Sequence, residues 1–188
     1  MEMIKDELSE EIIKTVKKLI NNDASQGITV KDVLKEMDIT NRVFYNRFHN
    51  MDEVLDILYQ EEIIKVRKSI FTPFKQGEDF NAYVLDIATK TLILLNDRAP
   101  HMSRYIFISD SENSANYNWW IKAISQIIRD GKKHHYLKED LEEAALSYSI
   151  WCFIRGFNLD AVARNLQKEE AIEIFKYGFS FFLKGIMN

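Results

Sequence analysis

The residues from Ile39 to Met51 combine side chains that recognise nucleic-acid bases with a complete absence of acids. Asp38 and Asp52 bound this stretch, and no Asp or Glu lies between them. Its polar and aromatic residues are Thr40, Asn41, Arg42, Phe44, Tyr45, Asn46, Arg47, Phe48, His49 and Asn50. Arginine and amide side chains form paired hydrogen bonds with base edges, whereas DNA phosphates would repel a carboxylate. The composition therefore indicates a segment that contacts DNA.

Three predicted helices would position this segment. Apolar residues at helical spacing predict a first helix before the polar loop NNDASQG. Thr29 with Asp32 three residues later predicts a capped start to a second helix. Asp38 tolerates the left-handed backbone of a tight corner, and Thr40 is a good cap for a third helix. Two short helices joined by such a corner, with another helix in front, are typical of a helix-turn-helix.

Apolar and polar residues of the third helix separate into two faces. Val43, Phe44 and Phe48 are expected to pack against the neighbouring helices. The outward residues would be Thr40, Asn41, Arg42, Tyr45 and Asn46. This pattern indicates a recognition helix in the major groove. The alternative is a purely structural helical hairpin, because Phe44 and Phe48 would be core residues in either case.

The chain beyond residue 50 is expected to be almost entirely helical. Asn50 with Glu53 predicts the start of a long fourth helix, which Thr72-Pro73 ends or kinks. Further helices are expected at about 79–97, 100–110, 114–131, 140–166 and 169–186. We therefore predict an all-α fold of about nine helices. Its parts would be a helix-turn-helix domain at 1–50, a connector to about 70, and a helical effector-binding and dimerisation domain at 71–188.

The last two predicted helices are apolar on more than one side. One set in the final helix repeats at helical spacing: Ile172, Phe175, Phe179 and Phe182. The preceding helix carries small residues that permit close approach: Ala144, Ala145, Ser149 and Gly156. A helix that is apolar on two sides must bury both of them. We therefore predict a homodimer through a four-helix bundle, with the first set at its interface. The alternative is a final helix wholly inside a monomeric core.

The middle helices offer candidates for a ligand pocket, which would be mostly apolar with a few polar groups. The candidates are Tyr83, Phe107, Trp120, Trp151 and Arg155. Plain core packing is the alternative for each of them. Arg155 is the least ordinary, since it lies between Ile154 and Gly156 in an apolar stretch. It would pair either with an acidic ligand or with a neighbouring helix.

Patterns typical of an enzyme, a metal site or a membrane protein are absent from the sequence. His134 and His135 are adjacent, so on a helix they diverge by about 100° and do not chelate one metal. Cys152 lies in an apolar helical segment, and neither a phosphate-binding glycine loop nor a GxSxG motif occurs. No apolar run approaches the roughly 20 residues of a membrane helix. We predict a cytoplasmic protein that is not an enzyme and needs no metal or cofactor.

The segment from Gly27 to Leu58 resembles the N-terminal DNA-binding domain of the tetracycline-repressor (TetR/AcrR) family. The resemblance rests on Thr29, on Ile39-Thr40 in the turn, and on Phe44-Tyr45-x-x-Phe48 followed by Asn50 and an acidic pair. It implies a homodimer whose two recognition helices enter successive major grooves of a near-palindromic operator on double-stranded DNA. It also implies a C-terminal helical domain that binds a small molecule and thereby alters DNA affinity.

The same resemblance assigns roles to individual residues. Thr29 and Lys31 would meet a phosphate or a base at the start of the second helix. Three residues would face base edges: Asn41, Arg42 and Val43. The residues that would reach phosphates or further base edges are Thr40, Tyr45, Asn46, Arg47 and His49.

The net charge of the predicted DNA-binding domain is unusual for a protein that binds DNA. Residues 1 to 50 contain eight Lys or Arg and nine Asp or Glu, a net of −1 within the −4 of the whole chain. A basic domain, the usual electrostatic footprint of DNA binding, is therefore replaced by a local patch. We expect a transcription regulator of the repressor type that is released by an apolar or aromatic effector and relies on dimerisation and base contacts. The alternatives are a regulator controlled by a protein partner, and a helical ligand-binding or scaffold protein whose DNA binding has decayed.

Overall fold

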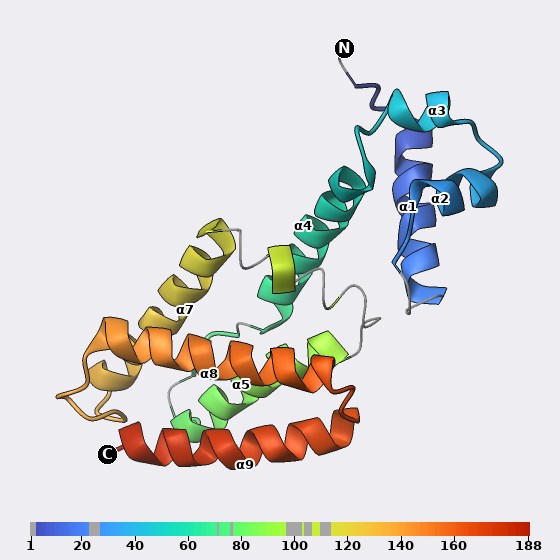
Figure 1. Ribbon diagram of the computed structural model, residues 1–188. Helices are drawn as coiled ribbons and strands as arrows, with labels where there is room; N and C mark the ends of the chain where they lie inside the picture. The colour runs from blue at the N-terminus through green and yellow to red at the C-terminus, as the bar shows by residue number, and fades with distance from the viewer. Residues whose placement is uncertain are drawn as a thin grey trace. The chain divides into compact units, whose positions relative to one another are not determined.

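The computed structural model describes residues 3–22, 27–70, 72–75, 77–96, 103, 107–109 and 114–188. Within these ranges the chain is all-α, with one isolated β-bridge between Leu137 and Met187 (Figure 1). The helices are α1 (Glu7–Asn22), α2 (Val30–Met37), α3 (Asn41–Tyr45), α4 (Met51–Ile70), α5 (Phe80–Asn96), α7 (Ser114–Lys133), α8 (Glu143–Ala163) and α9 (Lys168–Ile186). The predicted fold class is confirmed. The helix expected at 100–110 lies mostly outside the described residues.

The described chain groups into two compact units. The first unit consists mainly of residues up to Lys68, and the second begins at Ser69. The first unit thus contains α1, α2, α3 and nearly all of α4. None of the described helices is both long enough and apolar enough to cross a lipid bilayer.

The core of the first unit forms where one apolar face from each helix meets the others. The side chains that α1, α2 and the α3 region contribute are Ile12, Val16, Ile20, Val33, Phe44 and Phe48. The buried side chains that α4 contributes to this unit are Met51, Val54, Leu55, Leu58, Tyr59 and Ile63. This burial stabilises a small unit that must hold α3 with its polar face outward.

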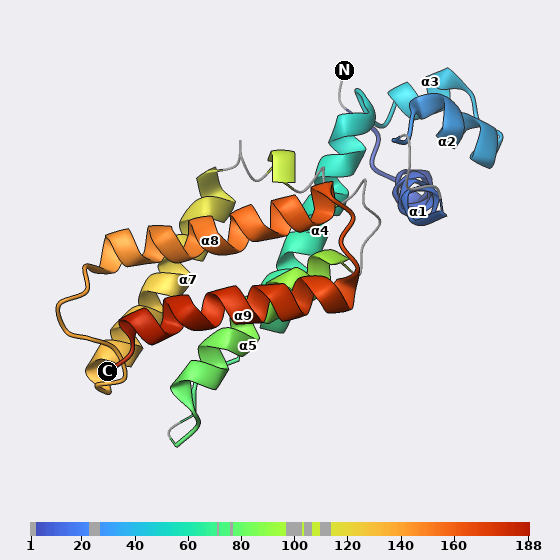
Figure 2. The same ribbon diagram turned by 60° about the horizontal axis from the view of Figure 1, so that its bottom comes forward.

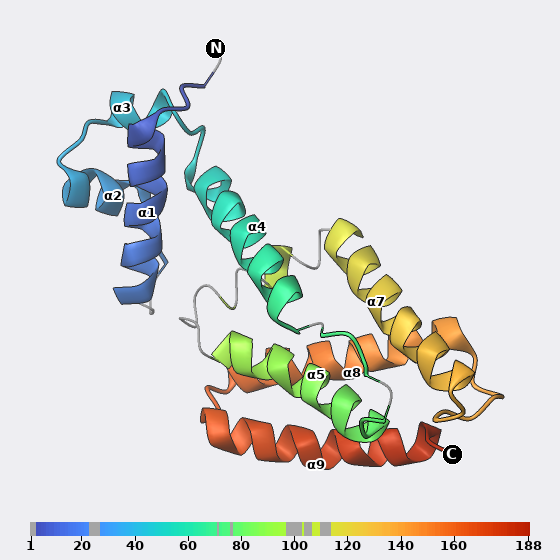
Figure 3. The same ribbon diagram turned by 180° about the vertical axis from the view of Figure 1, so that it is seen from behind.

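The second unit is built around α5, α7, α8 and α9. Helix α5 packs against α8 and α9, and α7 packs against α8 (Figures 2 and 3). One ridge of α9 is fully buried, with residues spaced four apart: Ala171, Phe175, Phe179 and Leu183. Phenylalanine rings join α8 to this ridge, since Phe153 lies 5.4 Å from Phe179 between ring centroids.

Helix α8 is shorter than the predicted range of 140–166. The Glu142 carboxylate accepts hydrogen bonds from the amides of Ala144 at 3.0 Å and Ala145 at 2.6 Å, so the helix begins at Glu143. These backbone bonds also lower the pKa of the Glu142 carboxyl, that of Ala145 most strongly. The helix ends at Ala163, because Asn165 adopts a left-handed backbone with φ of 53°.

The residues expected at the dimer interface need a correction. Phe175 and Phe179 are completely buried inside their own unit, and Ile172 and Phe182 are half-buried against the same core. Apolar residues on a different face of α9 are exposed instead: Ile174, Tyr177 and Phe181. Exposed apolar side chains of α8 include Tyr148 and Leu159. Periodicity correctly identified α9 as an apolar helix. The residues that we expected at the dimer interface, however, pack in the core of their own subunit.

Candidate nucleic-acid interface

The corner between α2 and α3 has the geometry that the sequence predicts. Asp38 adopts the left-handed conformation, with φ of 52° and ψ of 42°. The backbone amides of Asp38 and Ile39 both donate to the carbonyl of Leu34, which ends α2. Thr40 is extended, with ψ of 160°, and α3 begins at the next residue. The chain therefore turns sharply enough to present α3 as a separate short helix (Figure 1).

The start of α2 is fixed by the predicted pair of Thr29 and Asp32. The Asp32 carboxylate accepts hydrogen bonds from the Thr29 backbone amide at 2.8 Å and from the Thr29 hydroxyl at 2.6 Å. The hydroxyl bond is the main reason that the pKa of Asp32 is lowered. The capping pair is thus confirmed. The Thr29 hydroxyl acts as a donor to Asp32, while the threonine and neighbouring Lys31 remain exposed.

Aromatic packing holds the back of α3. Phe44 is fully buried and Phe48 nearly so, with their ring centroids 5.7 Å apart. Tyr45 places its ring edge against Phe44 at 5.4 Å and remains half exposed. This arrangement is the expected one, in which the phenylalanines anchor the helix and the tyrosine stays accessible.

The opposite face of α3 is polar and accessible. Thr40, Asn41, Arg42 and Tyr45 are exposed, while Val43 and Asn46 are half-buried. The Arg42 side chain forms no hydrogen bond or ion pair with any residue that the structure describes. Its five donors are therefore available for the acceptor pair on a guanine edge, and the neighbouring Asn41 amide for an adenine edge.

We expected the Arg47 side chain to contact DNA, but in the structure it is bound to Asp6. Its Nε and Nη2 donate to the two carboxylate oxygens of Asp6 at 2.9 and 2.5 Å, and its Nη1 donates to the Val43 carbonyl at 3.0 Å. The side chain is only 12% exposed. The guanidinium holds the pKa of the Asp6 carboxyl far below its usual range. The role that this geometry supports for Arg47 is to fasten α3.

The N-terminal segment completes this fastening. The backbone amide of Ile4 donates to the Asn46 carbonyl at 3.0 Å, directly after α3. The Ser9 hydroxyl in turn donates to the Ile4 carbonyl at 3.0 Å. Residues 4 to 9 thus form a strap across the end of α3, which we call the N-terminal strap. Sequence reasoning missed it because Asp6 and Arg47 are 41 positions apart.

His49 and Asn50 connect α3 to α4. The Asn50 side-chain oxygen accepts from the Glu53 amide at 2.9 Å, which is the predicted cap of α4. The Glu53 carboxylate accepts from the His49 amide at 2.7 Å and lies 3.0 Å from its Nδ1. The backbone bond contributes most to the lowered pKa of Glu53. His49 remains exposed.

Comparison with solved structures places this arrangement among known folds. A TetR-family transcriptional regulator from Pectobacterium atrosepticum matches with a TM-score of 0.76 at 10% identity, over 96% of this chain and 94% of the other. The ketosteroid transcriptional regulator KstR2 of Mycobacterium tuberculosis matches with a TM-score of 0.65 at 12% identity, over 98% and 97%. The chain has the TetR-family fold. No protein-family sequence model matches it, and no curated protein matches it by sequence.

A third match shows a TetR-like fold on DNA. BioQ, solved with its natural double-stranded DNA operator, matches with a TM-score of 0.58 at 13% identity, over 92% of this chain and 97% of BioQ. At this level of identity the likeness concerns the fold alone.

Within the TetR fold, the predicted ligand residues fall into two places. Trp151 lies 6.0 Å from Trp120 between ring centroids, and the Arg155 guanidinium lies over the rings of Trp151 and Phe107. Arg155 also donates to the Phe107 carbonyl at 2.8 Å. These four residues form a packed cluster, and a ligand contact by Arg155 stays a prediction. Tyr83 lies elsewhere, at a cleft beside α7.

His134 and His135 follow directly after α7. The described residues contain no group of three or more His, Cys, Asp or Glu side chains arranged to hold a metal ion. His135, with a left-handed backbone of φ 58°, is in the turn after α7, where its Nδ1 lies 3.2 Å from Glu139. His134 faces the cleft beside α7.

Replacing Asp6 with Asn should loosen the N-terminal strap and lower the urea midpoint of the first unit at pH 7. Because the pKa of Asp6 is depressed in the folded chain, its contribution is present above the unfolded value of 3.8 and is lost as pH falls further. The stability difference between wild type and Asp6→Asn should therefore be largest at neutral pH and shrink below about pH 4. Urea titrations by circular dichroism at several pH values measure this difference.

The matched control is Glu11→Gln, an exposed acid on α1 that makes no contact with Arg47. It should leave the midpoint unchanged at every pH. Equal midpoints for wild type and Asp6→Asn at pH 7 would show that the strap contributes nothing.

Proposed function

We propose that this chain is a DNA-binding transcription regulator that acts as a homodimer and is released from its operator by a small molecule. The observation that carries the proposal is the accessible, acid-free face of α3, with the side chains of Asn41 and Arg42 exposed. A buried Phe44 and a fastened Arg47 hold that face in place. Pre-positioned donors on a short helix are what direct reading of a major groove requires.

The exposed apolar faces of α8 and α9 support the homodimer. Tyr177 is 70% exposed and Phe181 54% exposed, although both are large aromatic side chains. On α8, exposed small residues lie at helical spacing: Ala145, Ser149, Gly156 and Ala163. A second copy that packs the same two helices against these faces would complete a four-helix bundle. Two copies of α3 would then address two half-sites.

The exposed polar face of α3 has few positive charges near it. Lys31 and Arg42 are exposed, whereas the Arg47 charge is matched by Asp6. Each subunit then neutralises few phosphates, so DNA affinity should fall with salt along a shallow slope for this class of protein. Base contacts and the pairing of two subunits must supply the remainder of the affinity.

Replacing Arg42 with Ala should weaken binding to the preferred site by about 1–3 kcal/mol and relax its sequence preference. Tyr45→Phe should weaken all DNA sequences to a similar degree, because a hydroxyl-to-phosphate bond positions the protein without specifying bases. Competition binding with specific and random duplexes separates the two effects.

Arg164→Ala serves as the matched control, since Arg164 is an exposed arginine of the second unit that pairs with Asp160. It should change neither affinity nor preference. Equal weakening of specific and random DNA by Arg42→Ala would contradict the base-reading role of Arg42.

A further inference from the structure

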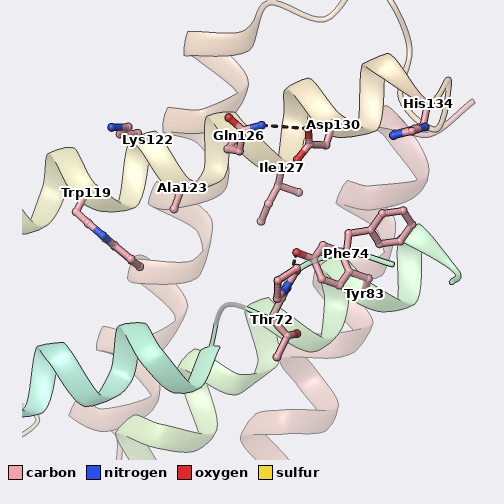
Figure 4. Close-up of a pocket in the computed structure, with 11 residues that line it drawn as sticks. Thr72, Phe74, Tyr83, Trp119, Lys122, Ala123, Gln126, Ile127, Asp130 and His134 are labelled. Carbon is pink, nitrogen blue, oxygen red and sulfur yellow. Dashed lines mark hydrogen bonds between the residues drawn. The ribbon is translucent and has the colours of Figure 1, made fainter. Parts of the chain in front are cut away.

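A cleft of about 700 Å³ lies in the second unit between α7, the start of α5 and residues 72–74 of the preceding connector (Figure 4). Its volume is in the range of pockets that enclose drug-sized molecules. The cleft shares no residue with the packed cluster of Arg155 and the two tryptophans. Of the ligand-binding residues predicted from the sequence, Tyr83 alone lines this cleft.

Helix α7 contributes two parallel rows of side chains to this cleft. Trp119, Ala123 and Ile127 form one row at a spacing of four, and Figure 4 shows Ile127 directed toward the connector. The polar row is Lys122, Gln126, Asp130 and His134. Because residues four apart lie above one another on a helix, the cleft has one apolar wall and one polar rim along the same helix.

Aromatic rings line the side opposite α7. Phe74 lies 5.1 Å from Tyr83 and 5.4 Å from Phe80 between ring centroids. The Tyr83 hydroxyl donates to the Thr72 carbonyl at 3.0 Å, which fixes the ring against the connector. From α7, Trp119 adds its ring to those of Phe74 and Tyr83 in the lining. The faces of such rings carry negative electrostatic potential and attract cations.

The rim of the cleft carries the Asp130 carboxylate. Asp130 is half-buried, and its Oδ1 accepts one hydrogen bond from the Gln126 amide at 3.0 Å. Within the described part of the chain, no Lys or Arg forms an ion pair with it. Burial, followed by the negative charges of Asp130 and Glu78, raises the pKa of Tyr83. This end of the cleft is thus electronegative as well as aromatic.

The lysine of the cleft does not cancel this charge. Lys122 is exposed and lies two helical turns from Asp130, at the Trp119 end of the rim. His134 is also exposed, one turn beyond Asp130. The half-buried Asp130 therefore dominates the part of the cleft closest to Phe74 and Tyr83.

We propose that this cleft binds an organic cation, with its positive centre at the Asp130 carboxylate and its apolar or aromatic groups against Phe74, Tyr83 and Trp119. The inference deepens the proposed function, because it names the chemical class of the effector. The negative charge of Asp130 would repel an anionic ligand. Binding of the cation itself does not depend on whether the chain binds DNA.

Tetraphenylphosphonium tests the cleft directly, because tetraphenylborate has nearly the same shape and the opposite charge. Isothermal titration of the full chain should show saturable binding of the phosphonium and much weaker binding of the borate. Asp130→Asn should weaken phosphonium binding about five- to tenfold, and Trp119→Leu about three- to fivefold. Asp140→Asn, an exposed acid outside the cleft, should bind as wild type does.

Equal or tighter binding of the borate would overturn the proposal, as would an Asp130→Asn variant that binds the phosphonium unchanged. Thermal melts of each variant establish that the second unit remains folded. Phosphonium binding that leaves DNA affinity unchanged would support the cleft assignment and contradict effector release. Absence of DNA binding with intact phosphonium binding would contradict only the proposed function.

Discussion

Replacing Phe44 with Ala should lower the free energy of unfolding of the first unit by about 3–5 kcal/mol. The side chain is completely buried and contacts the rings of Tyr45 and Phe48, so truncation leaves a cavity behind α3. This cost is a large fraction of the roughly 5–15 kcal/mol that stabilises a typical domain. The variant should therefore lose the ordered reading face and bind neither specific nor random DNA tightly.

The distribution of tryptophan makes this result measurable within the whole chain. All three tryptophans, Trp119, Trp120 and Trp151, lie in the second unit, so their fluorescence reports that unit. Urea unfolding of Phe44→Ala should show an early transition by far-ultraviolet circular dichroism that tryptophan fluorescence does not follow. Tyr45→Ala is the control on the same helix, and its half-exposed ring should cost about 1 kcal/mol. Similar midpoints for the two variants would contradict the role of Phe44 as the anchor.

Two substitutions on α9 should have opposite effects on stability and assembly. Phe179→Ala should destabilise the second unit by about 3–5 kcal/mol, because the fully buried ring packs against Phe153 and Phe175. Phe181→Glu should leave the fold of each subunit intact and convert the proposed dimer to monomer, because it places a charge on the exposed apolar face. Sedimentation equilibrium and tryptophan-detected unfolding separate these outcomes.

Ile64→Glu is the matched control for assembly, since it makes the same change at an apolar residue of α4 that is 50% exposed. It should leave the sedimentation of the dimer unchanged. A dimer that survives Phe181→Glu would place the interface elsewhere, and a wild-type chain that sediments as a monomer would exclude the dimer altogether.

Local signals in the sequence predicted the elements that depend on local interactions. The pair of Thr29 and Asp32, the left-handed Asp38 and the Asn50 cap each involve residues within a few positions of one another. For the same reason the bounds of α4, from Met51 to Ile70, agree with the predicted helix. Burial of Phe44 and Phe48 followed from their helical spacing of four residues, which predicted that both rings face the same side.

Features that depend on tertiary contacts were beyond such reasoning. The bond between Asp6 and Arg47 joins distant positions, so Arg47 seemed available for DNA. Periodicity does not distinguish the core face of α9 from an apolar face that is exposed, and Phe179 was therefore placed at the interface. One wall of the cleft beside α7 is formed by Phe74 in the irregular connector. The position of this connector cannot be predicted from a helical pattern.

Selection of bound duplexes from a random DNA pool tests the central proposal most directly. The wild-type chain should enrich a near-palindrome whose half-sites lie about one helical turn apart, because each subunit presents one α3 to the major groove. Footprints on the enriched duplexes should cover both half-sites, and Arg42→Ala should fail to enrich the same sequence. Enrichment of no sequence by the wild-type chain, or of a single asymmetric half-site, would contradict the account.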